Sequence, residues 1–346
     1  MYFFSFSRRN MGLTNQLFSL STGINDAIKN KSNVVVIDKF LCDYNNDKYI
    51  SIANVLDLDK MNVFFKEKYN LVLVDKYNFD FELLNVTYGI KDNQLDITEI
   101  IKKKYYHNKK LFITKHTNFN NICGDPCFGV KKYVWVKYKL NNYIITDKYN
   151  ENINVLTKDI DYTNENYIKS NMGWPSKSYD TFEDILTHIT YHTQFYHISN
   201  SQLSEVILTN KVNLIHLRIE KDAIKHWSKM NKMTEQDFKI KVENKYIKLI
   251  QTYIDKNDTT IILSSSFDNK VINFLDKNKY NYFTSKKNFK YRELNAVVDF
   301  IISKQCNNIF IGNFNFNGMN GSSFSYYIKN NLHSDIIYKY IDLDHI

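Results

Sequence analysis

Three polar segments of this 346-residue chain have residue types and spacings that suit chemistry on a charged ligand. They are Gly12-Leu13-Thr14-Asn15-Gln16, His216-Leu217-Arg218-Ile219-Glu220-Lys221-Asp222 and Gly321-Ser322-Ser323-Phe324-Ser325. Serine hydroxyls and the backbone amides of a helix N-terminus bind phosphate oxygens, and an arginine binds two such oxygens at once. The three segments therefore favour a site for a phosphorylated ligand.

The second segment ends an expected strand over residues 212–218. His216 and Arg218 share one face of that strand while Leu217 faces the core, so an imidazole and a guanidinium emerge side by side. An arginine stays charged and can stabilise the charge that develops on a departing nucleotide. The alternative is an ion pair of Arg218 with Glu220 or Asp222, beside a histidine that satisfies a structural hydrogen bond.

The first and third segments both join a strand to a helix. Gly12 would let backbone amides approach a phosphate, although a simple turn capped by Thr14 or Asn15 explains the first segment equally well. The residues from Gly321 to Ser325 offer hydroxyls and amides to an anion, and the alternative there is an ordinary serine N-cap. Each segment alone leaves both interpretations open.

Strands and helices alternate in the second half of the chain, which predicts a parallel sheet with right-handed crossovers and a Rossmann-like domain. The expected strands are 212–218, 260–263, 282–283 and 308–311, and the expected helices are 235–254, 268–277, 294–303 and one that begins near Ser322. Ligands of such sheets bind beyond the carboxyl ends of the strands. Arg218, Ser264, Gly312 and the loop to Ser322 fall at those ends.

The first half predicts a less regular α/β layer, with strands at 2–7, 34–38, 71–75 and 111–114 and helices after the first strand and over 97–104. Residues 143–179 are rich in Asn, Asp, Thr and Tyr, which predicts an irregular insertion or a crossover. These patterns divide the chain into an α/β domain at 1–205 and a Rossmann-like domain at 206–346.

Composition excludes several other classes. The net charge of +9 comes from scattered lysines rather than a basic stripe, so no nucleic acid partner is expected. Four dispersed cysteines form no disulfide framework or complete metal knuckle, and His188 and His192 lack the glutamate of a metalloprotease motif. No run of about 18 apolar residues and no signal peptide is apparent. We expect a cytoplasmic protein without an integral membrane segment or a bound metal.

Taken together and in this order, the segments resemble the motifs of the GDP-fucose-using fucosyltransferases, which include the protein O-fucosyltransferases and the α1,2- and α1,6-fucosyltransferases. The matching stretches are Gly12 to Gln16, His216 to Asp222 and Ser322 to Ser325. A fourth, Arg292-Glu-Leu-Asn-Ala-Val-Val-Asp299-Phe300, resembles the helix that carries a guanine-reading carboxylate. Thr14 departs from the family pattern, which usually has a second glycine there.

The resemblance implies a GT-B fold, with two Rossmann-like domains facing across a cleft, and an inverting transfer without a metal or other cofactor. It implies that Arg218 holds the β-phosphate, and that Asp299 accepts from guanine. It further implies that His216 and Asn15 contact hydroxyls of the donor sugar or the acceptor, and that Ser322, Ser323 and Phe324 bind the diphosphate. Asp222 would support the loop that contains Arg218, and Gly12 and Thr14 belong to the N-terminal loop.

The expected partners are therefore GDP-fucose and a glycan or protein acceptor. The general base stays open, with Glu220 the first candidate, because inversion requires a carboxylate or a histidine near the acceptor hydroxyl. Two alternatives also remain: a transferase for another 6-deoxy-sugar nucleotide, such as a rhamnose donor, and a non-catalytic protein of the same fold that binds glycans or nucleotides.

Overall fold

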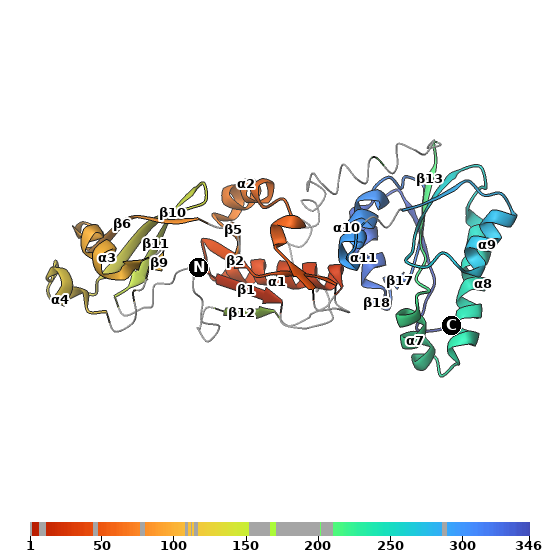
Figure 1. Ribbon diagram of the computed structural model, residues 1–346, viewed down its shortest axis with the longest axis horizontal. Coiled ribbons are helices and arrows are strands. Elements are labelled where there is room, and N and C mark those ends of the chain that lie inside the picture. Colours follow the sequence, from red (N-terminus) through yellow and green to blue (C-terminus); the bar gives the residue numbers. More distant parts are fainter. Residues whose placement is uncertain are drawn as a thin grey trace. The chain divides into compact units, whose positions relative to one another are not determined.

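The computed structural model describes residues 2–6, 12–43, 48–76, 80–107, 110–111, 113, 117–151, 167–170, 201, 210–285 and 289–346 (Figure 1). Within these residues the chain divides into two compact units. The first comprises Met1–Arg9, Ser19–Phe40 and Tyr49–Thr181, and the second comprises Asn10–Phe18, Leu41–Lys48 and Phe182–Ile346. The boundary predicted between 205 and 206 lies outside the described residues.

The first unit contains a four-stranded parallel sheet in the order β12-β1-β2-β5. Its strands are β1 (Tyr2–Phe6), β2 (Val34–Ile37), β5 (Val72–Asp75) and β12 (Tyr167–Ser170), and its helices are α1 (Leu13–Lys29) and α2 (Leu58–Tyr69). Asp57 caps the start of α2 by accepting from the Lys60 amide, and Asn70 ends that helix in the left-handed conformation. The three strands predicted at 2–7, 34–38 and 71–75 are confirmed within two residues.

A second sheet of the first unit is antiparallel, in the order β11-β10-β6-β7. It contains β6 (Phe81–Ile90), β7 (Asn93–Asp96), β10 (Tyr133–Leu140) and β11 (Tyr143–Asn150), with α3 (Thr98–Tyr105) and α4 (Phe119–Cys123) beside it. The prediction of irregular structure from Tyr143 onward is wrong for Tyr143–Asn150, where alternate side chains such as Ile145 enter the core. Residues 152–166 and 171–179 lie outside the described residues.

Short elements complete this part of the chain: β3 (Phe40–Asp43), β4 (Lys48–Ile50), η1 (Ile52–Asn54), β8 (Tyr106–His107) and β9 (Lys110–Leu111). Of the strand predicted at 111–114, Leu111 is the last residue of β9 and Ile113 forms a single bridge, while 112 and 114 lie outside the described residues. One apolar core joins both sheets of the first unit, since Val34 and Val74 belong to the same buried cluster as Leu83 and Val136.

The second unit is built on a five-stranded sheet in the order β15-β14-β13-β16-β19, with every neighbouring pair parallel. The strands are β13 (Val212–His216), β14 (Thr259–Leu263), β15 (Tyr282–Thr284), β16 (Ile309–Gly312) and β19 (Ile337–Tyr340). All residues of β13, β14 and β16 are buried, as expected where helices cover both faces. The predicted parallel sheet is confirmed, and β19 is an additional edge strand.

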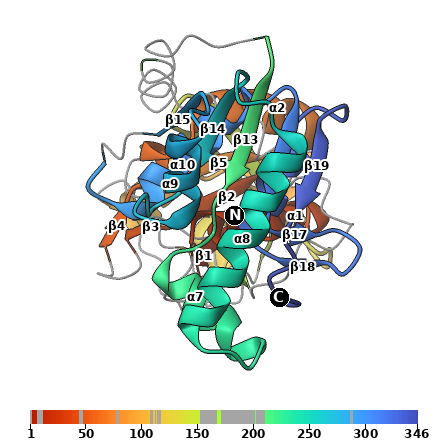
Figure 2. The same cartoon turned by 90° about the vertical axis from the view of Figure 1, so that its right-hand side faces the viewer.

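Helices cover both faces of this sheet (Figures 1 and 2). The helices are α7 (Lys221–Met230), α8 (Glu235–Tyr253), α9 (Lys270–Lys277), α10 (Arg292–Ser303) and α11 (Ser323–Asn331), and a hairpin of β17 (Phe314–Asn315) and β18 (Asn320–Gly321) precedes α11. Helices α7, α8 and α9 share one apolar cluster with Ile215 of β13 and Ile262 of β14. On the other side, the rings of Phe300 in α10 and Tyr327 in α11 meet edge to face at 4.6 Å.

The strand order places a topological switch point between β13 and β16. From β13 the chain builds outward to β14 and β15, and it then returns to the opposite side of β13 for β16 and β19. Loops that leave two such adjacent strands diverge, and the crevice between them is where ligands of doubly wound folds bind. The segments after β13 and β16 contain His216 to Asp222 and Gly321 to Ser325.

We predict that Ile215→Ala in the central strand will lower the free energy of unfolding by about 2–5 kcal/mol, because its fully buried side chain leaves a cavity between β13 and the helices α7, α8 and α9. Urea denaturation followed by circular dichroism measures this loss. The matched control is Ile240→Ala on α8, where the side chain is 39% exposed and a change within about 0.5 kcal/mol is expected. Equal losses in both variants would contradict the assigned core.

Candidate functional site

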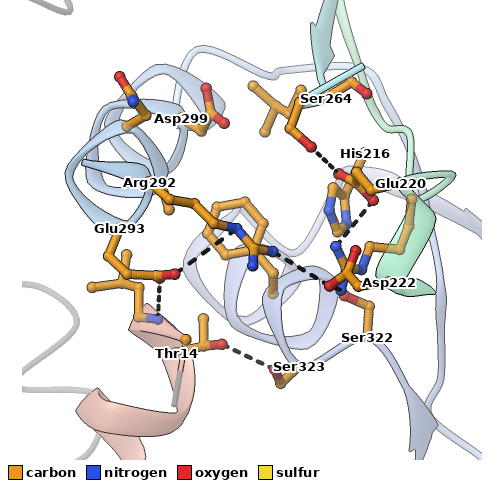
Figure 3. Close-up of a pocket in the computed structure, with 18 of the residues that line it drawn as sticks. Thr14, His216, Glu220, Asp222, Ser264, Arg292, Glu293, Asp299, Ser322 and Ser323 are labelled. Carbon is orange, nitrogen blue, oxygen red and sulfur yellow. Dashed lines mark hydrogen bonds and ion pairs between the residues drawn. The ribbon is translucent and has the colours of Figure 1, made fainter. Parts of the chain in front are cut away.

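A pocket of about 530 Å³ lies at the switch point of the second unit (Figure 3). Its wall combines the start of α1, the residues after β13 and β14, the first turns of α10 and the start of α11. Every residue predicted for the site lines it: Gly12, Thr14, Asn15, His216, Arg218, Glu220, Asp222, Asp299, Ser322, Ser323 and Phe324. Ser264 also lines the pocket, whereas Gly312 is absent from its lining and instead packs closely under the ring of Tyr338.

Arg218 is held between two carboxylates. Its Nη1 atom lies 3.0 Å from Glu220 Oε2, its Nη2 atom lies 3.2 Å from Asp222 Oδ2, and the side chain is 20% exposed. Burial acts to lower the pKa of Arg218, but the two carboxylates outweigh it and raise the pKa. The ion pair considered for Arg218 is therefore present, and the guanidinium is fixed in one orientation at the pocket wall.

The same pairing affects the two carboxylates. Burial alone would raise the pKa of Glu220, but the charges of Arg218 and His216 lower it, and Ser265 donates a hydrogen bond to the other carboxylate oxygen at 3.0 Å. Asp222 behaves in the same way, with Arg218 and Arg292 together lowering its pKa against the effect of burial. A carboxylate with a lowered pKa is a weaker base, so this arrangement is unfavourable for Glu220 as the general base.

Two cations of the pocket were not selected from the sequence, Lys290 and Arg292. Arg292 begins α10, is 37% exposed, and lies 3.7 Å from Asp222 through Nη2 and 3.9 Å from Glu293 through Nε. The motif that contains Asp299 also contains Arg292 and Glu293. Their position could have identified Arg292 and Glu293 from the sequence, because they occupy the first turn of a helix that follows a strand of the parallel sheet.

His216 is oriented by the hydroxyl of Ser325, which lies 2.7 Å from its Nδ1 atom. That hydroxyl also accepts from the Asn313 amide at 2.9 Å. The ring also meets Phe324 edge to face, with centroids 5.2 Å apart. Ser325 and Phe324 of the Gly321–Ser325 segment thus position His216.

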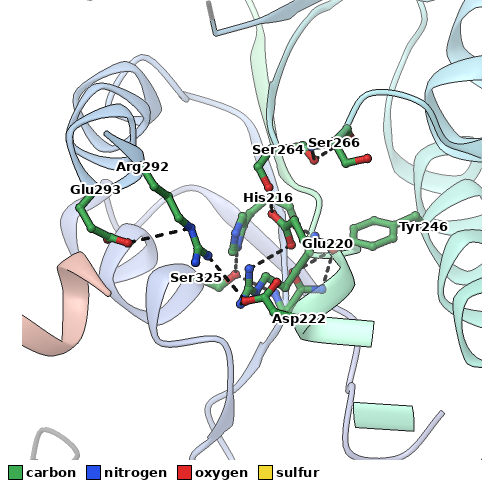
Figure 4. A network of polar contacts seen from close by, with 12 residues as sticks. His216, Glu220, Asp222, Tyr246, Ser264, Ser266, Arg292, Glu293 and Ser325 are labelled. Atoms are coloured by element: carbon green, nitrogen blue, oxygen red, sulfur yellow. Dashed lines mark hydrogen bonds and ion pairs between the residues drawn. The ribbon is translucent and has the colours of Figure 1, made fainter. Parts of the chain in front are cut away.

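The hydroxyl of Tyr246 joins the two loops from behind the pocket (Figure 4). It donates to the His216 carbonyl at 2.7 Å and accepts from the Arg218 amide at 3.0 Å and from Asn313 Nδ2 at 2.7 Å. Tyr246 is fully buried and comes from α8. One side chain therefore fixes the end of β13 and the turn after β16 relative to each other.

The start of α11 faces the pocket without a side-chain cap. Its approach depends on Gly321, which has a φ of +111° and where a Cβ atom would lie 2.1 Å from the Asn313 carbonyl oxygen. That carbonyl accepts from the Ser322 amide at 2.8 Å. Ser322 occupies the N-cap position considered for this segment, but its side chain makes no capping hydrogen bond, and the helix presents its positive end to the pocket.

The start of α1 is arranged differently, because an acidic side chain already occupies it. The Leu13 amide donates to the carboxylate of Glu293, and the Thr14 hydroxyl contacts Ser323 Oγ at 2.9 Å. The buried amide of Gln16 exchanges two hydrogen bonds with the backbone of Leu41, at 2.8 and 2.9 Å. A carboxylate at this helix end opposes a phosphate, so the phosphate-binding interpretation of the Gly12 segment is disfavoured.

Asp299 lies farther along α10, with 8% of its surface exposed. It accepts a hydrogen bond from the Ser285 hydroxyl, which follows β15. The structure thus places this carboxylate beside the carboxyl end of a sheet strand.

The distribution of charge limits where an anion can lie. Among the described residues that line the pocket, five are carboxylates and three are cations: Asp43, Glu220, Asp222, Glu293 and Asp299 against Arg218, Lys290 and Arg292. An anion is favoured only where cations and helix amides meet. That place is formed by Arg218, Arg292 and the start of α11.

The fold and the site define an α/β protein with an anion-favouring pocket at the switch point of a parallel sheet. In solved structures the chain is similar to POFUT1, a GDP-fucose protein O-fucosyltransferase. The likeness to its complex with GDP-fucose has a TM-score of 0.52 at 10% identity and covers 97% of each chain. For its complex with GDP, the TM-score is 0.50 at 10% identity, covering 97% of this chain and 98% of the other.

This likeness shows that the chain has a fucosyltransferase-like α/β fold. No protein-family model and no curated protein matches the sequence. Over the described residues, no helix has the length and apolar character needed to cross a membrane.

We predict that Tyr246→Phe will lower the free energy of unfolding by about 1–3 kcal/mol, because the Arg218 amide and the His216 carbonyl lose a buried partner. Thermal and urea unfolding measure this loss. Tyr253→Phe on the same helix is the control, since that ring is 39% exposed and little change is expected. A Tyr246→Phe variant as stable as the control would contradict the role given to this hydroxyl.

Proposed function

We propose that this protein is an inverting glycosyltransferase that transfers L-fucose from GDP-fucose to a hydroxyl of a glycan or protein acceptor. The proposal includes a GT-B architecture, with domains at 1–205 and 206–346, and a reaction that uses no metal ion. It is supported by the fucosyltransferase-like fold and by the sequence motifs whose residues line one pocket.

The observation that carries the proposal is the pairing of an uncapped helix start with a rigid guanidinium at the switch point. The amides at Ser323 and Phe324 begin α11, and Arg218 lies at the end of the neighbouring strand segment. Amides and guanidinium groups are the donors that a diphosphate requires. Both are held in place by Tyr246 and Asn313 before any ligand binds, so little reorganisation is needed.

In the proposed reaction, Arg218 holds the β-phosphate and stabilises the departing GDP. The amides and hydroxyls of Ser322, Ser323 and Phe324 bind the diphosphate, and Asp222 keeps the loop after β13 in position. Asp299 accepts from the guanine base. His216 and Asn15 bind hydroxyls of the sugar or of the acceptor.

The transfer forms one bond and breaks another. The acceptor oxygen attacks the anomeric carbon from the face opposite the leaving group, and the bond from that carbon to the phosphate oxygen breaks. The electron pair passes to GDP, whose charge the cations and helix amides offset. The acceptor proton goes to a base.

We predict that GDP will raise the melting temperature of the wild type more than UDP or dTDP, and that Arg218→Lys will lower kcat/KM for transfer from labelled GDP-fucose by about 100-fold or more. Lysine keeps a charge beside Glu220 and so limits misfolding, but it loses the planar fork that binds two oxygens. Thermal shift and initial-rate assays measure the two effects.

Lys221→Ala provides the control, because this exposed lysine belongs to the same segment as Arg218 yet does not line the pocket. Stabilisation by UDP or dTDP instead of GDP would support a different donor, such as a rhamnose nucleotide. GDP binding with no transfer or hydrolysis would point to a non-catalytic binding protein. Either result would overturn the proposed reaction.

A further inference from the structure

Glu293 is an acidic side chain of the pocket whose role neither the sequence motifs nor the diphosphate site explains. It lies in the first turn of α10, is 3% exposed, and lines the pocket at the edge next to α1 (Figures 3 and 4). Gly12 has no side chain to cover it, and a Cβ atom there would lie 3.7 Å from the nearer carboxylate oxygen. A buried carboxylate is costly and requires a compensating reason.

Three of the other four carboxylates of the pocket have different partners. Glu220 and Asp222 form the ion pairs with Arg218, and Asp299 accepts from the Ser285 hydroxyl. Glu293 accepts a hydrogen bond from the Leu13 amide through Oε2. Its Oε1 atom lies 3.9 Å from Arg292 Nε, which is beyond hydrogen-bond distance. Among these four acidic groups, Glu293 is the one whose position combines burial, contact with the pocket and a distant counter-charge.

The groups that face Glu293 come from four segments. Arg292 of α10, the Leu13 amide of α1 and Arg218 act to lower its pKa, whereas burial and Asp43 of β3 act to raise it. Burial is the largest influence, and the pKa of Glu293 is raised. Its charge in turn contributes to raising the pKa of the buried Cys42 thiol, an effect that is due mainly to burial. The carboxylate is therefore a stronger base than an exposed glutamate.

We propose that Glu293 is the catalytic residue that accepts the proton of the acceptor hydroxyl. This inference rests on the proposed function and assigns the base that the motifs leave open. The acceptor O–H bond breaks and the proton moves to a Glu293 carboxylate oxygen, while an oxygen electron pair forms the bond to the anomeric carbon. The sugar–phosphate bond breaks, and its electron pair leaves with GDP.

Glu293 lies beside Gly12 and Leu13 at the start of α1. The 2.9 Å contact of Thr14 with Ser323 joins this edge of the pocket to the start of α11. In the proposed reaction the sugar lies between Glu293 and the phosphate-binding groups of Arg218 and α11, so that the base and the leaving group act on opposite faces of the anomeric carbon, as inversion requires.

Glu293→Gln tests the inference with little disturbance of the fold, since the amide oxygen can still accept from the Leu13 amide. We expect kcat for transfer to fall by about 100-fold or more, while the affinity for GDP stays within about threefold of the wild type. The fall of wild-type activity on the acid side of its pH profile, where the carboxylate becomes protonated, should be absent from the variant.

Stability separates this catalytic role from a purely structural one. A carboxyl group with a raised pKa destabilises the folded state above that pKa, and the protein gains stability as the pH falls through it. Removing the charge should therefore leave the melting temperature at neutral pH unchanged or raise it. A residue that served only to cap α1 would lower the melting temperature on substitution without changing the pH profile.

Asp43→Asn is the matched comparison, because Asp43 is the remaining acidic residue among the described pocket lining. The inference is overturned if the kcat of Glu293→Gln stays within about tenfold of the wild type and its activity still falls at low pH, or if only Asp43→Asn removes that fall.

Glu293→Asp guards against misfolding of the glutamine variant. Its activity should still fall at low pH, and the absence of this fall in a folded aspartate variant would contradict the role of Glu293. A wild type that fails to bind GDP would refute the proposed function itself, whereas GDP binding with full Glu293→Gln activity would refute only this inference.

Discussion

The guanidinium of Arg218 lies between Glu220 and Asp222 at 3.0 and 3.2 Å, at the carboxyl end of the central strand segment of the second unit. A cation that is 20% exposed is stable there only because both carboxylates accompany it. This requirement explains why the pocket contains more acidic than basic groups although it has a side that favours anions. The ion pairs do not compete with a binding role, since an arginine has five N–H donors in a fixed plane.

The rest of the second unit supports that arrangement. Parallel strands bring the loops after β13 and β16 to one edge, and Tyr246 and Ser325 then connect them through buried hydrogen bonds. Gly321 permits the turn that leaves α11 uncapped toward the pocket. The second helix start of the pocket, that of α1, is occupied by Glu293. One helix end is thus suited to an anion, and the other carries a buried carboxylate.

Much of the second unit was predictable because its strands are continuously apolar and its helices have a clear apolar period. The strands at 212–218, 260–263 and 308–311 were expected within two residues, and residues after the ends of β13 and β14, such as Arg218 and Ser264, line the pocket. The antiparallel sheet of the first unit was harder to predict. In Tyr143–Asn150 the exposed Ile144 and the buried Asp147 break the expected alternation of apolar inward and polar outward residues, so the strand is recognised only by its pairing with β10.

The partners of each site residue could not be predicted from the sequence. The pattern showed that Arg218 had acidic neighbours, but whether they paired with it depended on the turn after β13. The contact of Leu13 with Glu293 joins residues 280 positions apart, and no local pattern encodes it. For the same reason, the sequence could not predict that Glu293 occupies the start of α1 while the start of α11 has no side-chain cap.

A crystal structure of the protein with GDP bound tests the central claim most directly. The account predicts that the diphosphate lies against the amides of Ser323 and Phe324 with Arg218 on its β-phosphate, and that guanine reaches Asp299. A diphosphate bound instead at Gly12 beside Glu293, or no GDP in the pocket at saturating concentration, would contradict it.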